Sequence, residues 1–400
     1  QKKLQQPKGQ PMDRHCRDIS LFQLLDRKAF DALVTRHQMD KWVRSFSTWE
    51  FTCSLVTALT LRLDSYRDVE AVLRIPRSTF GDAMNERFHG FFQDLCDLVL
   101  QEIRARTPNR KVKRAIRAVL AIDSTECQVH GSIFSSLPAW RQRKAHGVQA
   151  ACKIHVVYDV DGEWIDDFKV TSGRKHDSPA GLDLRLLAGK IYVFDRAYND
   201  MDFWLKILDS GSQFVSRLKD SCGRRYHLAQ ILEETPQRRD GVLWEGNYTP
   251  SQPQMDRYRK RAKEVTQLRH IIYRDPETKK IFHFITSDRK LSARAVADIY
   301  KRRWAVELLF RWLKGHIDIR YLPVKSSNAV KIQIAAAVLV QLLLQLRRLK
   351  TKFKGTLWDS LRLIRSNMIR ISLNSGDRSL ASGGCRWTGP PALDQQVVFT

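Results

Sequence analysis

Two short apolar runs that each end on an aspartate constrain the fold of this chain more than any other feature. They read AVLAIDST over residues 118 to 125 and IYVFDRAY over residues 191 to 198, and they end on Asp123 and Asp195. A continuous apolar run of this length is typical of a strand that is buried on both faces. We therefore expect each aspartate at the end of a strand, where its side chain emerges at the edge of a sheet.

The segments between these two runs complete the predicted sheet. ACKIHVVYDV and WIDDFKVTS flank the turn Asp161-Gly162 and predict a β-hairpin. The following stretch, HDSPAGLDLRLLAGK, predicts a helix. Three strands, a helix and a further strand indicate an α/β fold in which helices pack on a mixed sheet.

The charge of the chain points to a polyanionic partner. Lys and Arg number 69 against 43 Asp and Glu, which leaves a formal charge of +26. Such an excess favours nucleic acid, because each phosphate that Lys or Arg neutralises releases condensed counterions. The basic stretch from Arg104 to Arg117 could follow a DNA backbone, and a flexible linker is the simpler alternative.

Other features of the composition exclude several classes of protein. The seven cysteines are scattered and form no Cys-x-x-Cys pair, which fits reduced thiols in a cytoplasm and predicts no zinc module. The first twenty residues are polar, so no secretory signal is expected there. The most apolar run, Ala335 to Leu346, is short and contains two glutamines, which favours a buried helix over a membrane span.

The rest of the chain predicts further domains, since 400 residues exceed one ordinary core. Apolar spacing is mostly helical from about residue 20 to 100, whereas the stretch after residue 205 contains short strand-like runs between turns. We predict a disordered tail (1–11), a helical DNA-binding domain (12–110), a catalytic domain (115–205 and 287–350), a β-rich insertion (206–286) and a partly disordered C-terminal segment (351–400).

A polar stripe is predicted on the helix that follows the insertion. This helix should begin after Ser292 and end near Gly315. At about 100° per residue, four of its side chains fall within about 60° of one another, and Arg311 lies beside them. The four are Tyr300, Arg303, Glu307 and Lys314. A solvated face with internal charge pairs is the alternative interpretation.

Three carboxylates are the candidate metal ligands. Asp123, Asp195 and Glu307 supply hard oxygen atoms of the kind that Mg²⁺ and Mn²⁺ prefer. Two such ions can activate a nucleophile and stabilise the leaving oxygen in phosphoryl transfer. Other acidic side chains compete for this role, although a turn or a strand edge explains most of them: Glu126, Asp159, Asp161, Asp166, Asp167 and, next to His176, Asp177.

The same residues carry a resemblance to a known family. The spacing Tyr-x2-Arg-x3-Glu-x6-Lys in YKRRWAVELLFRWLK resembles the signature of DDE transposases of the insertion-sequence-four family. IDST and VFDRAY are similar to that family's two aspartate motifs, although Ala197 stands where many relatives have glycine. The N-terminal stretch LFQLLDRKAF…SYRDVEAVL resembles the helical domain of one branch of the family.

The resemblance implies a fold and a role for each matching residue. It implies a ribonuclease-H-like catalytic domain with a β-rich insertion, in which Asp123, Asp195 and Glu307 are catalytic and bind two Mg²⁺ ions, with Mn²⁺ able to substitute. Tyr300, Arg303 and Lys314 would then contact DNA phosphates. Trp244, in the insertion, is the candidate for stacking on a flipped base, with a place in the core as its alternative.

The function implied is that of a prokaryotic, cytoplasmic, nucleoid-associated cut-and-paste transposase. It would act as a homodimer on double-stranded DNA, binding both transposon ends and target DNA. A ribonuclease-H-like nuclease without strand transfer and a catalytically silent, domesticated DNA-binding protein are the alternatives. Joining activity separates the first from a transposase, and the intact acidic trio argues against the second.

Overall fold

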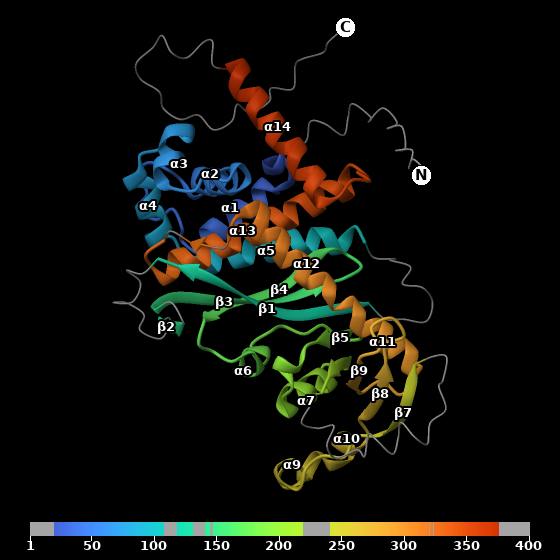
Figure 1. Cartoon of the computed structure of the whole chain (residues 1–400). Helices are drawn as coiled ribbons and strands as arrows, with labels where there is room; N and C mark the ends of the chain where they lie inside the picture. Colours follow the sequence, from blue (N-terminus) through green and yellow to red (C-terminus); the bar gives the residue numbers. More distant parts are fainter. Residues whose placement is uncertain are drawn as a thin grey trace, which may run out of the picture. The chain divides into compact units, whose positions relative to one another are not determined.

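The chain folds into two compact units in the computed structural model (Figure 1). One unit comprises Gln1–Asn109 and Leu313–Thr400, and the other comprises Arg110–Trp312. The structure describes residues 20–107, 118–130, 141–144, 147–218, 241–319, 321–322 and 324–375. The predicted tail over residues 1–11 and most of the basic linker therefore lie outside the described residues.

The unit of residues 110–312 is built on one mixed sheet. Its strands run in the order β2-β3-β1-β5-β6-β9-β8-β7, and β4 pairs with β3. The stretch β4-β3-β1-β5-β6 has three antiparallel strands followed by two parallel ones, which is the ribonuclease-H-like order. The predicted mixed α/β fold is thus confirmed. The strands are β1 (Val119–Val129), β2 (Arg141–Lys144), β3 (Gly147–Asp159), β4 (Trp164–Ser172), β5 (Ile191–Phe194), β6 (Gln213–Arg217), β7 (Val242–Asn247), β8 (Arg269–Arg274) and β9 (Ile281–Thr286).

The predicted hairpin is present as β3 and β4. Their connection is closed by Asp159, whose Oδ1 accepts a 2.6 Å hydrogen bond from the backbone N–H of Gly162. Tyr158 pairs with Ile165 and Asp159 with Trp164, so the pairing reaches the turn. The hairpin is thus present at the predicted turn, although its register shifts between Val157, which pairs with Asp167, and Tyr158.

The insertion begins later than the sequence predicts. Residues 213–217 form β6, which pairs in parallel with β5 and so belongs to the central sheet. The helix α7 (Met201–Asp209) makes the connection between these two strands. After residue 240, the strands β9, β8 and β7 extend the same sheet in antiparallel fashion. Residue 206 was too early a boundary because α7 and β6 bury their apolar side chains in the central core.

Helices cover the sheet according to the alternation of side chains along its strands. Leu120 and Ile122 of β1 share a buried cluster with Phe203 of α7, together with side chains of β5 and β6. Even-numbered residues of β1 therefore face α7, and odd-numbered ones face the other side. The remaining helical elements of this unit are α6 (Asp177–Gly181), η5 (Arg196–Tyr198), α9 (Gln252–Arg257), η7 (Arg259–Arg261), α10 (Ala262–Thr266), α11 (Ala293–Arg302) and α12 (Trp304–Trp312).

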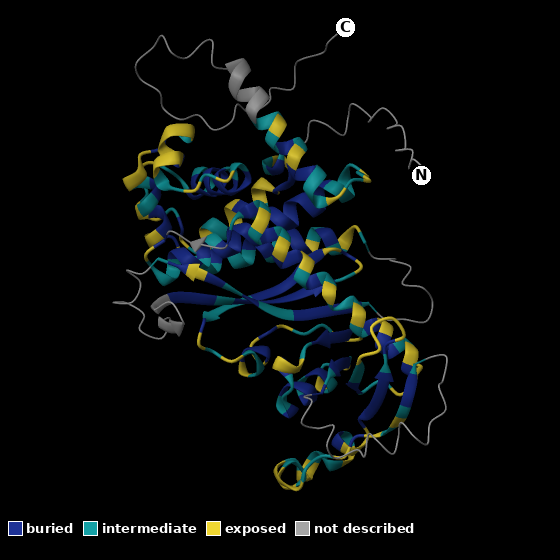
Figure 2. Cartoon of the chain, viewed as in Figure 1, coloured by how far each residue is buried: buried dark blue, intermediate teal, exposed yellow. Residues whose placement is uncertain are grey.

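The other unit is helical and packs around α13 (Ser327–Lys350), which contacts α2 and α5. Apolar residues lie all around α13, and Figure 2 shows this helix mostly in the colour of buried residues. It is long and apolar enough to cross a membrane, but 89% of its most apolar window is buried inside the protein. The other elements are η2 (Leu21–Leu24), α1 (Arg27–Arg36), α2 (Thr48–Leu61), α3 (Tyr66–Leu73), α4 (Arg77–Glu86), α5 (His89–Ala105), a π-helical turn η8 (Leu313–Ile317), β10 (Tyr321–Leu322) and α14 (Leu357–Ser375).

Two predicted domain boundaries differ from the observed boundaries of this helical unit. The sequence assigned residues 287–350 to the catalytic domain, whereas α13 belongs to the helical unit because its apolar surface packs on α2 and α5. The predicted C-terminal segment, 351–400, contains the helix α14, and residues 376–400 lie outside the described residues. The N-terminal helices themselves agree with the prediction, and side-chain caps such as Ser47 and Ser65 begin two of them.

Candidate active site

The parallel pairing of β1 and β5 brings the two predicted aspartates together. Ile122 is paired with Phe194, and the next residue on each strand is Asp123 or Asp195. Neighbouring strands lie roughly 4.8 Å apart, so the two carboxylates emerge side by side. Asp195 does end its strand, but Asp123 does not, because β1 continues to Val129. That part of the sequence prediction was wrong: the strand passes from burial on both faces to alternation, and only its apolar half is obvious in the sequence.

Two side chains of the predicted polar stripe bind these aspartates, and one of them also binds Glu307. The guanidinium of Arg303 donates from Nη1 to Asp123 Oδ2 at 2.8 Å and from Nη2 to Glu307 Oε1 at 2.5 Å. Tyr300 donates its hydroxyl to Asp195 Oδ1 at 3.3 Å. The helix α12 also contacts β1 directly. The structure therefore gathers Asp123, Asp195 and Glu307 around one arginine and one tyrosine.

The sequence predicts one continuous helix for the stripe, but the structure has two helices, α11 and α12. Ser292 caps its start as expected, accepting from the backbone N–H of Ala295. Arg303, however, separates α11 from α12, with a bond from its N–H to the oxygen of Tyr300 and another from the N–H of Val306 to its own oxygen. Both hydrogen bonds join residues three apart, as in a 3₁₀ helix, and so the turn is tighter than in an α-helix. The tighter turn lies at the residue whose guanidinium bridges two carboxylates.

Burial and charge shape the ionisation of the site. Burial raises the pKa of Asp123 to about 6; the charges of Glu307 and Asp195 act in the same direction, whereas Arg303 opposes them. Burial and the charge of Asp195 raise the pKa of Tyr300 to about 12. Although burial alone lowers the pKa of Arg303, its bond to Glu307 and the charge of Asp123 raise it above its ordinary value. Tyr300 is thus a neutral hydroxyl donor and Arg303 a fixed cation.

The donor set fits a hard divalent cation. Three carboxylates offer oxygen atoms only, and the effect of Asp195 and Glu307 on the pKa of Asp123 places all three within electrostatic reach. Across the described part of the chain, no three His, Cys, Asp or Glu side chains are arranged to hold one ion. At this site the Arg303 guanidinium is bonded to both Asp123 and Glu307. Arg303 and a metal ion are therefore alternative partners for the same oxygen atoms.

The competing acidic residues lie elsewhere. Glu126 is on the opposite face of β1 from Asp123, three residues along the strand. Asp159 closes the hairpin, and Asp161 pairs with Arg302. Asp167 accepts the backbone N–H of Arg185 at 2.7 Å, and its neighbour Asp166 is buried. His176 precedes α6, and Asp177 binds Ser124 on the far face of the sheet.

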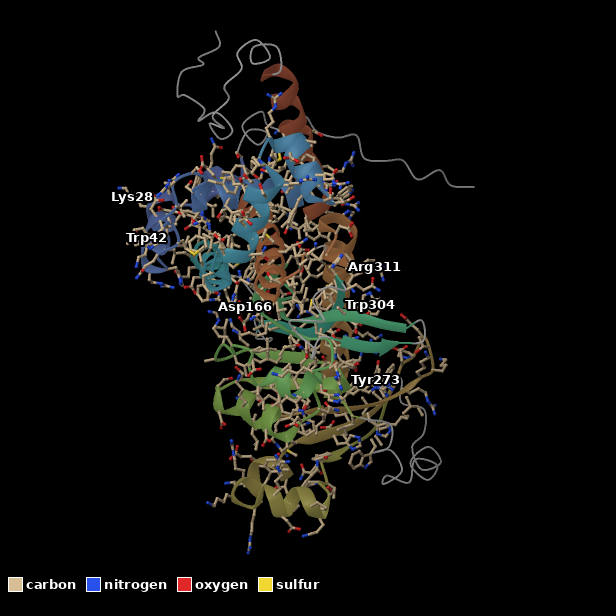
Figure 3. All side chains as sticks on the ribbon, turned by 90° about the vertical axis from the view of Figure 1, so that its left-hand side faces the viewer. Lys28, Trp42, Asp166, Tyr273, Trp304 and Arg311 are labelled. Carbon is tan, nitrogen blue, oxygen red and sulfur yellow. The ribbon has the colours of Figure 1, made fainter. Side chains whose placement is uncertain are left out.

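The remaining predicted DNA contacts lie in other elements of the structure. Arg311 is exposed on α12, where Figure 3 labels it together with the half-exposed Trp304. Lys314 lies in η8, a turn of the helical unit. Trp244 lies in β7, four strands from β5 and so roughly 19 Å away at ordinary strand spacing. Its ring packs edge-to-face with that of His270. Their roles in DNA binding stay predictions.

The sequence analysis did not identify Tyr198, a buried residue next to the Asp195 motif. Tyr198 stands three residues after Asp195, is fully buried, and returns through the 3₁₀ turn η5 toward β3. Its hydroxyl lies 2.9 Å from Nδ1 of His155. No local pattern marks it, because its partner His155 lies far away in the sequence.

Comparison with known proteins supplies the family. The sequence profile described as the transposase DDE domain matches residues 114–343, more than half of the chain. The chain belongs to the transposase DDE domain family. This confirms the resemblance seen in the sequence, and DDE transposase domains generally use divalent metal ions. A second profile, described as a domain of unknown function (DUF4372), matches residues 20–79.

Relatives of this transposase-domain chain are similarly named. A putative transposase of Sinorhizobium fredii is 31% identical over 60% of this chain, and the match spans 63% of that protein's length. A probable transposase for an insertion sequence element of Geobacillus stearothermophilus is 27% identical over 76% of this chain and 77% of its own length. Among solved structures, the piggyBac transposase synaptic complex with hairpin DNA matches with a TM-score of 0.48 and 12% identity, over 92% of this chain and 84% of that one.

Proposed function

We propose that this chain is a cut-and-paste DNA transposase. It binds the terminal inverted repeats of an insertion sequence, cleaves the ends and transfers the 3′-hydroxyl to target DNA. The observation that carries the proposal is the convergence of Asp123, Asp195 and Glu307 around Arg303 and Tyr300. A cluster of carboxylates held by cations and hydroxyl donors suits phosphoryl transfer, in which charge develops on phosphate oxygens.

The residues divide the chemistry between them. Asp123, Asp195 and Glu307 would hold two Mg²⁺ ions, with Mn²⁺ able to substitute, which when bound activate the attacking water or 3′-hydroxyl and stabilise the leaving oxygen. Arg303 presents a planar guanidinium that can bind two phosphate oxygens at once. Tyr300 keeps its proton at neutral pH and so donates to Asp195 or to a phosphate. Arg311 and Lys314 would each bind a further phosphate of the DNA.

The partners follow from this chemistry. The ligand is double-stranded DNA, both the element's ends and the target, and the active form is a homodimer that pairs two ends. Trp244 is the candidate for a flipped base if cleavage passes through a hairpin. The protein would act in the prokaryotic cytoplasm, where its DNA substrate lies.

The test is cleavage of duplex DNA carrying the element's own ends by the full chain with Mg²⁺. Glu307→Ala should bind this DNA but cut it about a thousand-fold more slowly, because losing a metal ligand costs several kcal/mol in the transition state. Glu277→Ala, which removes an exposed carboxylate, is the matched control and should cut normally. Unchanged cleavage by Glu307→Ala would overturn the proposal. Cleavage without joining of the 3′-hydroxyl would favour a nuclease instead.

A further inference from the structure

A buried polar network lies under the two aspartates, on the opposite face of the sheet. Ser124 and His155 are directly paired across β1 and β3 and so share that face. Ser124 Oγ donates to Asp177 Oδ1 at 2.8 Å. Lys153 donates to the same oxygen at 3.2 Å. This face therefore contains a carboxylate that is itself held by a hydroxyl and an ammonium group.

The network continues through His155 to the turn that carries Asp195. Nδ1 of His155 lies 3.7 Å from Asp177 Oδ1 and 2.9 Å from the Tyr198 hydroxyl, and Nε2 lies 2.9 Å from Thr171 Oγ1. His155 and Tyr198 are both completely buried. Burial lowers the pKa of His155 to about 4, with Asp177 opposing this shift, so the imidazole is neutral at physiological pH. Each ring nitrogen has a partner, which fixes the orientation of the ring.

Both ends of the network belong to the aspartate motifs. Ser124 follows Asp123, and its backbone N–H donates to Asp123 Oδ1 at 2.8 Å. Tyr198 belongs to the 3₁₀ turn that starts after Asp195, and its backbone N–H donates to the backbone oxygen of Asp195 at 3.0 Å. A shift of either hydroxyl is thus transmitted to the backbone of a carboxylate on the other face.

We infer that Tyr198, His155 and Asp177 are positioning residues that set the separation of Asp123 and Asp195 for metal binding. The inference rests on the proposed function and assigns no contact with DNA or metal to these residues. Residues that orient metal ligands typically change metal affinity by about 10- to 100-fold when they are altered. A network that only stabilised the core would change stability and leave metal affinity unaltered.

The chain offers a matched pair of variants for this distinction. Tyr198→Phe removes the hydroxyl that binds His155. Tyr192→Phe removes a hydroxyl that is equally buried on the neighbouring strand β5, where it accepts from the Leu187 N–H at 2.5 Å and donates to the Leu187 oxygen at 3.1 Å. Both variants keep the aromatic ring and lose hydrogen bonds of similar kind. Only the first is connected to both aspartate motifs.

The experiment measures Mn²⁺ binding to the full chain on a pre-cut duplex end that lacks the 3′-hydroxyl, so that no chemistry follows. Loss of the free Mn²⁺ signal in electron paramagnetic resonance reports the affinity, and thermal unfolding is recorded for each variant. We expect Tyr198→Phe to weaken Mn²⁺ binding about 10- to 100-fold, with cleavage of intact ends restored at high Mn²⁺. Tyr192→Phe should lower the unfolding temperature similarly but keep the wild-type affinity.

Ser124→Ala provides a second variant, which cuts the network at its other end and should also weaken Mn²⁺ binding. Equal affinities for Tyr198→Phe, Ser124→Ala and Tyr192→Phe would overturn the inference. Glu307→Ala separates this failure from failure of the proposed function. If Glu307→Ala abolishes Mn²⁺ binding and the network variants do not weaken it, only the positioning role is wrong. If Glu307→Ala leaves Mn²⁺ binding unchanged, both are wrong.

Discussion

The N-terminal helical region (residues 20–107) and the sheet unit (residues 110–312) differ in net charge. Residues 20–107 contain twelve Lys and Arg and twelve Asp and Glu, whereas residues 110–312 contain 38 and 25. In the helical region several cations are paired with acids, as in Arg87 with Asp40 and Arg36 with Asp94. The positive charge that attracts DNA is therefore supplied by other parts of the chain, the sheet unit among them.

This difference bears on the prediction of a helical DNA-binding domain. A region without net charge gains little from counterion release, which supplies most non-specific affinity for DNA. Recognition of the terminal repeats by this region stays a prediction, and it would depend on base contacts more than on phosphate contacts. The sheet unit is expected to supply the larger, salt-dependent part of the affinity.

The largest contrast is expected between two arginines that bind carboxylates, one in each region. Arg303→Ala should slow cleavage about a hundred-fold or more, as expected for the loss of one donor at a reacting phosphate. Because Arg303 competes for carboxylate oxygens, the same variant should bind Mn²⁺ roughly tenfold more tightly without DNA, or about 1.4 kcal/mol. Electron paramagnetic resonance on the DNA-free chain measures this. Weaker Mn²⁺ binding by this variant would show that Arg303 does not compete with the ion for the carboxylate oxygens.

Arg87→Ala is the counterpart in the helical region. Arg87 is buried and donates to the Phe46 oxygen at 2.8 Å and to Asp40 Oδ1 at 3.1 Å. Its loss leaves buried acceptors without a donor, so the free energy of unfolding should fall by about 3 kcal/mol. Urea unfolding of both variants gives the comparison. A larger loss of stability for Arg303→Ala than for Arg87→Ala would reverse the roles assigned to the two arginines.

An intermediate effect is expected from exposed cations. Replacing Arg259, Lys260 and Lys263 of the sheet unit with alanine should lower the slope of log affinity against log salt by up to about 2.7, or about 0.9 for each phosphate contact. The matched triple in the helical region, which is equally exposed, should change the slope by less than one; it comprises Lys28, Arg67 and Arg77. Titrations of DNA binding between 50 and 200 mM salt, or about that range, measure the slopes. Equal slopes for the two triples would remove the contrast.

The smallest effect is expected in acid stability. Burial lowers the pKa of His155 to about 4 and that of His270 to about 3, and both lie in the sheet unit. Their unfolded pKa is near 6.5, so the neutral imidazoles contribute stability that is complete above that pH and is lost as pH falls toward 4. As the pH falls, hydrogen exchange should show β3 and β8 losing protection before α2, which contains no histidine. The exposed His176→Gln serves as a control and should not alter this order.

The sequence predicts the aspartate pair because burial on both faces leaves a continuous apolar run that stops at a carboxylate. It also predicts the hairpin at Asp161-Gly162 and the cap at Ser292, since both depend on local backbone chemistry. It could not predict the separation of α11 from α12 at Arg303, because that turn goes with a long-range bond from Arg303 to Asp123. Nor could it assign α13, since an apolar helix carries no record of its partners.

Replacing Asp195 with cysteine tests the central claim most directly. A thiolate is a poor ligand for Mg²⁺ and a better one for softer ions such as Mn²⁺. The claim predicts that Asp195→Cys fails to cut the element's ends with Mg²⁺ and regains cleavage with Mn²⁺, whereas Asp195→Ala stays inactive with both. Cleavage by Asp195→Cys at the wild-type rate with Mg²⁺ would contradict the assignment of Asp195 as a metal ligand. Failure with both ions, if the variant is folded and binds DNA, would contradict it equally.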